Sequence, residues 1–531
     1  MDNSNMKKPW QRLHIGGFAP RKWMAANIPN FLFLVVITLA YGLLFTFADF
    51  YGLPYRGLSD LLVQVLQWTV VTAATFLLLW ALSISRYVFA VVLPPLTLLC
   101  AVAAYFRFTA HVTLTPMAID LAMVNDMRTT MDVVTLPLVL FCLACVALSV
   151  WAVIYRIKKL SFKPWYIHAA ASLLLLACVM NNWRLARPIM QRIPFNIYAA
   201  TSQYIDDRRT VSEQRPALPG TVVAPDDSID VVFILGETLR AKNMQINGYA
   251  RPTTPLLCKE PNAVSLPHVY SEYGFTHTSV PYILTRANPK DHDAAYRERS
   301  FFDIFKRAGF HTAWIANQES VGTFIYFMKE ADSLVYVNSG KSMYVFDKWI
   351  DGDVMPSLKR QLAANSARRM VLIHTIGSHW WYRSHYPESF ARWKPELKSR
   401  VLSANTKEEF VNSYDNSVLY SDYFWHQVIS LLRQRNAIVI YLSDHAENLG
   451  EDGVFGHGEE TPHLHYPGCW VWFSDEYARR YPAKIKALRK NARKNWNSDF
   501  LFHSIIDAAG IRYSATDRSR DIFSQDGDKS R

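Results

Sequence analysis

The sequence predicts a five-span helical membrane domain followed by an exported α/β domain. Half of the 531 residues are hydrophobic, and the first third of the chain holds five apolar stretches long enough to cross a bilayer. Positive charge alternates between the short loops that join these stretches. Beyond about residue 229, β-branched runs alternate with helical patterns, which is typical of a sheet covered by helices. A chain of this length has room for two or three domains.

The five apolar stretches are interpreted as membrane-spanning helices. The first is long and no small-residue cleavage site follows it, which favours an anchor over a signal peptide. The last is the shortest. The stretches occupy Phe31–Phe47, Leu61–Leu82, Tyr87–Phe106, Val133–Tyr155 and Trp165–Met180.

Loop charges orient these spans. Basic residues gather before the first span, in the second loop and in the fourth loop, whereas the first loop holds only Arg56 and the third Arg107 and Arg128. The positive-inside rule then places the N-terminus in the cytoplasm and everything after the fifth span outside. The basic residues on the cytoplasmic side are Lys7, Lys8, Arg12, Arg21, Lys22, Arg86, Arg156, Lys158, Lys159 and Lys163.

The formal net charge of +12 comes partly from these loops. A basic chain can also bind nucleic acid, but zinc-finger spacing, an RNP-like motif and an arginine-rich arm are all missing from the sequence. Attraction to anionic lipid head groups is the better use of the surplus charge, so we expect no nucleic-acid partner. Cys258 and Cys469 are the two cysteines of the exported part, which is too few for a disulfide framework and leaves their pairing open.

The pattern divides the chain into four regions. Residues 1–182 form the transmembrane domain, and residues 183–228 a linker helix, within Asn181–Arg215, that rests on the outer leaflet and a Pro-containing connector. Residues 229–515 form the exported domain and residues 516–531 a polar, disordered tail. In the exported domain we expect strands at Val231–Leu235, His311–Ala316, Met370–His374, Ala437–Leu442 and Cys469–Phe473, and helices at Ser300–Arg307, Lys407–Gln434 and Asp499–Ala509.

Two of the expected strands end at metal-binding side chains. VVFILGET carries Glu237 at its end, and IVIYLSDHAENLG carries Asp444 and His445. Parallel strands deliver such residues to one edge of a sheet, and two carboxylates with an imidazole suit a divalent cation, with zinc the leading candidate. The alternatives are a carboxylate that caps the next helix and a histidine packed in the core. IHTIGSH adds His374 and His379 after another strand.

These fragments together resemble the phosphoethanolamine transferases of the Gram-negative inner membrane, in the alkaline phosphatase/sulfatase superfamily. The resemblance covers nearly the whole chain, with GET followed by NGY, HTIGSH, SYDNSV and SDHAENLGEDGVFGHG in the family's order. It implies a five-span membrane domain and a periplasmic α/β sandwich domain of alkaline phosphatase/sulfatase type.

The resemblance also implies a threonine nucleophile in a segment of the form T-x-x-S-V-P. Thr276 takes that position here, and Thr278 is a rival two residues on. The family's metal ligands correspond to Glu237, Thr276, Asp444 and His445. They would hold one tightly bound zinc ion, with a second ion as an option and Mn²⁺ less favoured.

Further histidines and a membrane loop complete the implied site. His379 and His457 match family histidines near the transferred phosphate, where they would protonate the leaving group, activate the acceptor or help to hold a second metal. His463 and His465 offer similar chemistry or simply lie in a surface loop. Asn125, Thr129 and Asp132 in the third loop correspond to residues that meet the ethanolamine head group, with a solvated loop as the alternative.

The implied activity is transfer of phosphoethanolamine from phosphatidylethanolamine to lipid A or the inner core of lipopolysaccharide, through a covalent phosphoethanolaminyl-threonine. A periplasmic glucan is another acceptor. The rivals are a phosphoglycerol transferase of the lipoteichoic-acid-synthase type and a catalytically silent membrane scaffold. Two departures from the family are visible: SEYGFTHTSVP lacks the cysteine before the nucleophile, and AWIANQESVGTF lacks a lysine found near the phosphate in some relatives.

Overall fold

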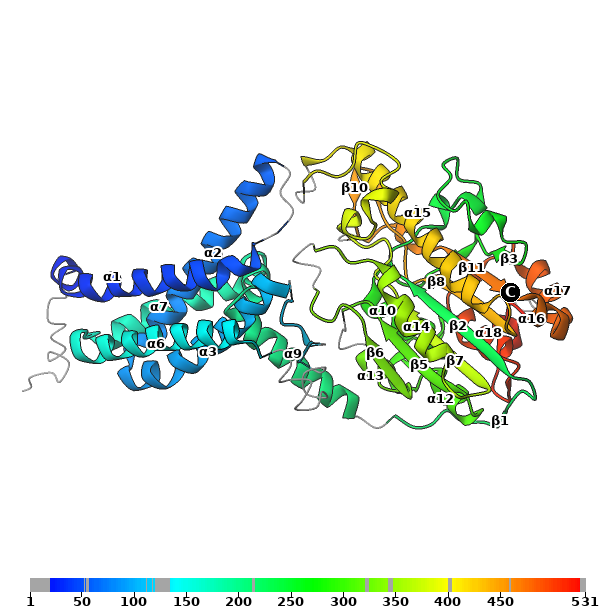
Figure 1. Cartoon of the computed structure of the whole chain (residues 1–531), viewed down its shortest axis with the longest axis horizontal. Helices are drawn as coiled ribbons and strands as arrows, with labels where there is room; N and C mark the ends of the chain where they lie inside the picture. The colour runs from blue at the N-terminus through cyan, green and yellow to red at the C-terminus, as the bar shows by residue number, and fades with distance from the viewer. Residues whose placement is uncertain are drawn as a thin grey trace, which may run out of the picture. The chain divides into compact units, whose positions relative to one another are not determined.

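The computed structural model describes residues 20–51, 53, 57–110, 112–116, 118–119, 134–212, 215–319, 324–341, 347–399, 404–457 and 460–525. These residues fall into two compact units. The first unit is helical and holds the apolar N-terminal helices (Figure 1). The second contains the α/β domain from Tyr198 onward together with short pieces of the first and third loops.

The N-terminal helices agree with the predicted spans, with one difference at the fifth. Four helices are each long and apolar enough to cross a membrane, and the fifth candidate is a pair, α7 and α8, bent by 96°. The described region therefore has four candidate spans, or five if the bent pair counts as one. The helices are α1 (Pro20–Leu44), α2 (Leu58–Ile84), α3 (Arg86–Ala110), α6 (Leu136–Lys159), α7 (Trp165–Asn181) and α8 (Trp183–Met190).

The segment predicted as one linker helix forms two helices. Asn182 ends α7, and its side chain accepts a hydrogen bond from the Arg184 N–H, so that it caps the start of α8. A turn at residues 191–194 then separates α8 from α9 (Phe195–Ser212). Pro194 has no N–H to continue a helix, which explains why α9 begins immediately after it. The break at Asn182 agrees with the predicted boundary after the fifth span, whereas the expectation of a single linker helix was wrong at the turn between α8 and α9.

A seven-stranded sheet forms the centre of the second unit (Figure 1). Its order is β3-β11-β8-β2-β7-β5-β6, and β8, β2, β7, β5 and β6 run parallel, whereas β11 is antiparallel to β8. All five predicted strands are confirmed, and two shorter ones are added. The strands are β2 (Ile229–Gly236), β3 (Ala263–Ser265), β5 (His311–Ala316), β6 (Ser333–Tyr336), β7 (Arg368–His374), β8 (Ala437–Ser443) and β11 (Cys469–Phe473).

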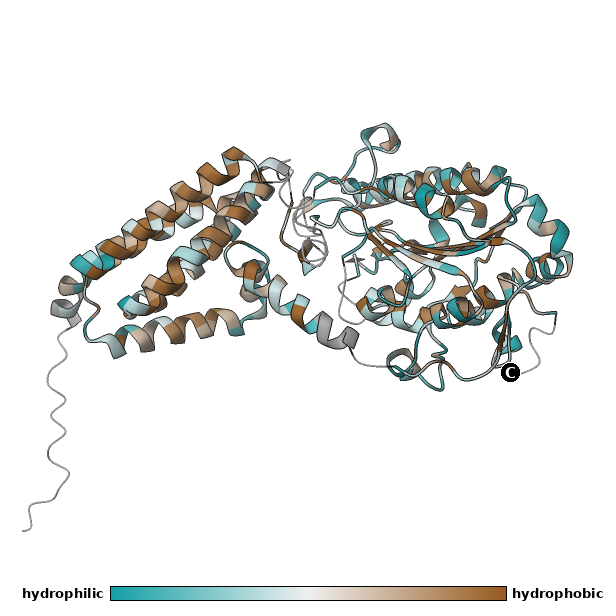
Figure 2. Ribbon diagram, turned by 60° about the horizontal axis from the view of Figure 1, so that its bottom comes forward, coloured by the Kyte–Doolittle hydropathy of each residue, from teal (hydrophilic) through white to brown (hydrophobic). Residues whose placement is uncertain are grey.

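Helices cover both faces of this sheet, as the alternating pattern predicted. One apolar cluster joins one face of the sheet to α10 (Thr276–Leu284), α12 (Phe302–Arg307) and α18 (Phe500–Ala508). A second cluster joins the other face to α14 (Met355–Leu362) and α15 (Lys407–Leu432). The central strands are buried on both faces and are hydrophobic along their length (Figure 2).

The C-terminal segment is ordered further than the sequence predicted. The expected disordered tail began at residue 516, yet Ile522 and Phe523 are buried in the core, and the Asn491 amide donates to the carbonyls of Ile522 and Ser524. Burial of these two apolar side chains stabilises the folded arrangement, and the segment is described as far as residue 525. Residues 526–531 lie outside the described part of the chain.

Candidate functional site

Sheet register brings the predicted metal-binding residues together. Strands β2 and β8 are neighbours, and Gly236 pairs with Ser443 at their carboxyl ends. Glu237 directly follows β2 and Asp444 directly follows β8, so these two residues lie side by side at the sheet edge. Glu237, Asp444 and His445 are fully buried and place one potential ligand atom each within 4.8 Å of one another.

Three neighbours fix the position of Glu237, two through its carboxylate and one through its backbone. The carboxylate accepts hydrogen bonds from the Thr238 hydroxyl at 2.5 Å and from the Gln318 side-chain amide at 2.9 Å. Gly377 passes so close that an added Cβ would lie 2.6 Å from the Glu237 carbonyl oxygen, and its φ of +52° also favours glycine. Asp351 fixes this turn, because its carboxylate accepts the N–H groups of Ile376 and Gly377.

The two carboxylate oxygens of Asp444 differ in their contacts. Its Oδ1 accepts hydrogen bonds from the N–H groups of Thr238 and His445. Its Oδ2 is buried, has no hydrogen-bond partner among the residues that the structure describes, and lies 3.5 Å from Nε2 of His445. A buried carboxylate oxygen without a partner is costly, so this atom is suited to bind a cation.

His445 presents an unprotonated nitrogen to the same point. Its Nδ1 lies 2.7 Å from the Ala446 carbonyl oxygen, which can only accept, so Nδ1 carries the proton. Nε2 keeps its lone pair and faces the two carboxylates. Burial lowers the pKa of His445, against the opposing charge of Asp444, so the neutral form is favoured.

Thr276 is the first residue of α10 and joins this cluster. Its Oγ1 lies 3.1 Å from Glu237 Oε2 and 3.3 Å from His445 Nε2. The end of the helix is fixed to the sheet edge, because the hydroxyls of Ser271 and Ser279 both donate to the Asp444 carbonyl. The rival Thr278 points its hydroxyl elsewhere and donates to the Phe275 carbonyl at 3.0 Å.

The donor set fits a zinc ion. Zinc ligands in proteins lie about 2.0–2.1 Å from the ion in a tetrahedron, so neighbouring ligand atoms are about 3.3 Å apart. The distances recorded between Thr276, Glu237, Asp444 and His445 in this cluster run from 3.1 to 3.5 Å. Burial and the Asp444 charge raise the pKa of Glu237 well above its ordinary value, which is the cost of placing two carboxylates together without a cation.

Two more predicted histidines lie beside the cluster. The His457 ring lies 5.0 Å from the His445 ring and 5.1 Å from the His379 ring, between centroids. Burial disfavours a charge on His457, but Glu447, whose Oε2 is 3.3 Å from its Nδ1, outweighs this and raises the pKa of His457 to about 9. Burial and the nearby His457 lower the pKa of His379 well below its ordinary value. The site thus pairs a cationic imidazole with a neutral one.

The remaining predicted residues are placed as follows. His465 has both ring nitrogens engaged, with the Ser271 carbonyl and the Glu460 carboxylate at 2.7 Å each. His463 is more exposed and lies 3.8 Å from Asp452. His374 is buried between the rings of Trp314 and Phe324. Asn125, Thr129 and Asp132 lie outside the described residues.

Sequence reasoning missed Gln318 and Glu447. Gln318 follows β5 by two residues, so the rule that located Glu237 at a strand end also applied to it. A neutral amide is not a typical metal ligand, so the residue type alone does not mark this strand end as part of a site. Glu447 stands two residues after His445, and nothing in its spacing shows that it faces both His457 and the Tyr382 hydroxyl.

Comparison with known proteins places this site in a family context. The Sulfatase family model matches residues 229–511. The chain is 30% identical over 309 residues to phosphoethanolamine transferase EptA of Escherichia coli K12, covering 54% of each chain. It is 36% identical over 275 residues to the Kdo(2)-lipid A phosphoethanolamine 7''-transferase of Salmonella typhimurium, covering 49% of this chain and 48% of the relative. The chain thus spans about half the length of the curated relatives it matches.

Solved structures share the fold. The integral membrane lipooligosaccharide phosphoethanolamine transferase A of Neisseria meningitidis aligns over 92% of this chain and 98% of its own, with a TM-score of 0.52 and 22% identity. The periplasmic domain of EptC from Escherichia coli, in a complex with Zn, aligns over 60% of this chain and 92% of its own, with a TM-score of 0.54 and 22% identity. At these identities the likeness concerns the fold alone.

Proposed function

The chain belongs to the sulfatase family, and we propose that it is a zinc-dependent phosphoethanolamine transferase of the bacterial inner membrane. The observation that carries this proposal is the Thr276 hydroxyl, which lies at the start of α10 within 3.3 Å of Glu237 and His445. The same cluster holds an Asp444 oxygen that has no partner in the described part of the chain. The curated relatives, which are named phosphoethanolamine transferases, support the same reaction.

The first half-reaction places Thr276 as the nucleophile. Its oxygen attacks the phosphorus of phosphatidylethanolamine, and the bond from phosphorus to the diacylglycerol oxygen breaks. A bound zinc ion, held by Glu237, Thr276, Asp444 and His445, would supply the Lewis acidity that makes the hydroxyl easier to deprotonate. The N-terminus of α10 favours the negative charge of the phosphate, because the helix dipole is positive there.

The two histidines divide the proton transfers. His457 is cationic, so we assign it the proton that the diacylglycerol oxygen takes as it leaves. His379 is neutral, and its Nδ1 donates to the Trp380 carbonyl at 2.5 Å, which leaves Nε2 free to accept the proton of the incoming acceptor. The acceptor oxygen then attacks phosphorus and the bond to Thr276 breaks. The proton that His379 accepted passes to the Thr276 oxygen and restores its hydroxyl. The proton that Thr276 released to solvent on activation is replaced on His457, so both histidines return to their starting states.

The acceptor in this proposal is lipid A or the inner core of lipopolysaccharide. The relative of known acceptor class acts on Kdo(2)-lipid A, according to its name.

The proposed membrane topology has five spans, with the bent α7 and α8 pair as the fifth. The N-terminus lies in the cytoplasm and the α/β domain of residues 229–515 in the periplasm. The loop charges support this orientation.

The test is a trapping experiment on the purified full-length chain. Incubation with phosphatidylethanolamine and no acceptor should leave a phosphoethanolamine adduct on Thr276, detected by mass spectrometry of the peptide. Thr276→Ala should abolish the adduct and the transfer. Thr278→Ala is the matched control and should keep both, because its hydroxyl is bonded to the Phe275 carbonyl. An adduct on Thr278, or one formed with phosphatidylglycerol instead of phosphatidylethanolamine, would contradict the proposal.

A further inference from the structure

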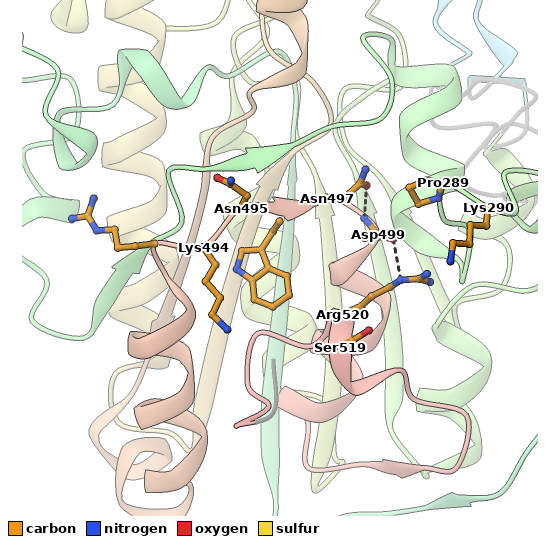
Figure 3. Close-up of a pocket in the computed structure, with 10 residues that line it drawn as sticks. Pro289, Lys290, Lys494, Asn495, Asn497, Asp499, Ser519 and Arg520 are labelled. Carbon is orange, nitrogen blue, oxygen red and sulfur yellow. Dashed lines mark hydrogen bonds and ion pairs between the residues drawn. The ribbon is translucent and has the colours of Figure 1, made fainter. Parts of the chain in front are cut away.

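A second cavity of about 560 Å³ lies in the α/β domain, apart from the threonine and its ligands. Three separate chain segments form it: the loop after α10, the turn and strand that follow α17 (Pro482–Asn491), and the η10 turn (Arg518–Arg520). Figure 3 shows Pro289 and Lys290 on one side, facing Lys494 and Asn495 across the cavity.

The cavity is strongly basic. Four of its lining side chains are cations, and Asp499 is the one carboxyl among its lining residues. Within the described part of the chain, the side-chain nitrogens of Lys290 and Arg493 have no hydrogen-bond or ion-pair partner. The four cations are Lys290, Arg493, Lys494 and Arg520.

Arg520 is the best-positioned of these cations. Its Nε lies 3.3 Å from Asp499 Oδ2, a contact drawn in Figure 3, and 3.6 Å from Asp517 Oδ2. These two carboxylates hold the guanidinium in place at the cavity. A guanidinium has five N–H donors, so others remain for a ligand. An arginine fixed in this way is well suited to bind a phosphate or carboxylate with two hydrogen bonds.

The size and lining of the cavity indicate the rest of the ligand. A volume of this order belongs to small-molecule sites, which typically measure about 300–1,000 Å³, and it exceeds what one inorganic anion needs. Trp496 is the one large apolar side chain in the lining, and Asn495 and Ser519 add polar groups that match sugar hydroxyls. An acyl chain would find little apolar surface here.

The cavity is joined to the candidate active site through the backbone. Its strand β12 (Trp496–Asn497) pairs with β4 (Val269–Tyr270), and the Asn497 amide donates to Glu272 at 2.8 Å. Residue 272 stands four positions before Thr276. A ligand bound in the cavity would therefore lie against β12, which is bonded to the segment that leads into the nucleophile helix.

We propose that this cavity binds the negatively charged saccharide of the acceptor through its phosphate or carboxylate groups. This inference rests on the proposed function for the identity of the acceptor. It assigns Arg520, Lys290 and Arg493 to acceptor binding, and leaves the attack of Thr276 on the donor independent of them.

The test uses the full-length chain in detergent, in a Thr276→Ala background so that binding is measured without turnover. Glucosamine 6-phosphate, glucosamine and inorganic phosphate are titrated in turn by calorimetry. Glucosamine 6-phosphate should bind most tightly, and Lys290→Gln with Arg493→Gln should weaken it about tenfold, the scale of one charge-assisted hydrogen bond. The matched control is Arg479→Gln with Lys486→Gln, which removes the same charge from exposed positions outside the cavity.

A second measurement separates this inference from the proposed function. With Thr276 restored, the cavity variant should raise KM for lipopolysaccharide several-fold and form the threonine adduct from phosphatidylethanolamine at the wild-type rate. A wild type that forms no adduct would contradict the proposed function but not the sugar-phosphate binding. Equal losses in the cavity and control variants, or equal affinity for inorganic phosphate and glucosamine 6-phosphate, would overturn the saccharide site. Retention of wild-type affinity by the cavity variant would also overturn it.

Discussion

Replacing Gly377 by alanine should disable the site while the fold survives. The added Cβ would lie 2.6 Å from the Glu237 carbonyl oxygen and 3.0 Å from its N–H nitrogen, and both are backbone atoms that cannot rotate away. To reach an ordinary contact of 3.4 Å, the new Cβ and the Glu237 carbonyl oxygen must move about 0.8 Å further apart. The turn cannot supply all of this movement, because Asp351 holds the N–H groups of Ile376 and Gly377. Glu237 must therefore move.

The displacement sets the size of the effect. Functional groups need placement within about 0.5 Å, and an error near 1 Å can cost about 100-fold in rate. Under the proposed function, we therefore expect Gly377→Ala to transfer phosphoethanolamine about 100-fold more slowly and to bind zinc at least about 10-fold more weakly. The left-handed φ of +52° adds about 1–2 kcal/mol of strain, which a domain of this size can tolerate.

Gly248→Ala is the matched control. Gly248 also has a left-handed φ, +96°, but an added Cβ would meet nothing within 4 Å. It should lose similar stability in a thermal melt and keep its activity and its zinc. The measurements are the initial rate with phosphatidylethanolamine and the metal content of the purified chain. A Gly377→Ala protein with the wild-type rate and zinc content, or a Gly248→Ala protein as impaired as Gly377→Ala, would refute the reasoning.

Three further outcomes are expected. His445→Ala should lose most of the bound zinc, measured by elemental analysis, and full occupancy would remove His445 from the ligand set. Glu447→Gln should slow transfer about tenfold at unchanged zinc content, because Glu447 holds the charged His457; an unchanged rate would show that this contact is not needed. Burial raises the pKa of Asp422 to about 7, from an unfolded value near 3.8. Between about pH 4 and 7 the folded state therefore binds more protons than the unfolded state, and the protein loses stability as the pH rises through that window. Asp422→Asn should flatten the pH dependence of the melting temperature there, and an unchanged slope would count against that assignment.

The parts of the site that could be predicted from sequence are those set by strand ends. Glu237 and Asp444 each follow a continuous β-branched run, and adjacent parallel strands bring such positions together whatever surrounds them. Thr276 needed more, because no periodicity distinguishes it from Thr278. The family motif favoured Thr276, and the structure shows the Thr278 hydroxyl bonded to a carbonyl instead.

The parts that sequence did not yield depend on tertiary contacts. The roles of Gln318 and Glu447 come from their contacts with Glu237 and His457, and the linear sequence does not reveal such contacts. The C-terminal segment was misjudged for a related reason. Its average polarity predicted a tail, but the burial of Ile522 and Phe523 depends on a partner, Asn491, some thirty residues earlier.

All six cysteines of the chain are free thiols, including Cys258 and Cys469 in the α/β domain. The tertiary fold described above is therefore held by noncovalent packing alone. Its maturation does not wait for an oxidising catalyst, and a reductant has no crosslink to cut. Loss of a cell's thiol-oxidation machinery should therefore leave the level of this protein unchanged. Buried Cys469 is shielded from oxidants, whereas the exposed Cys258 sulfur is open to reversible capping.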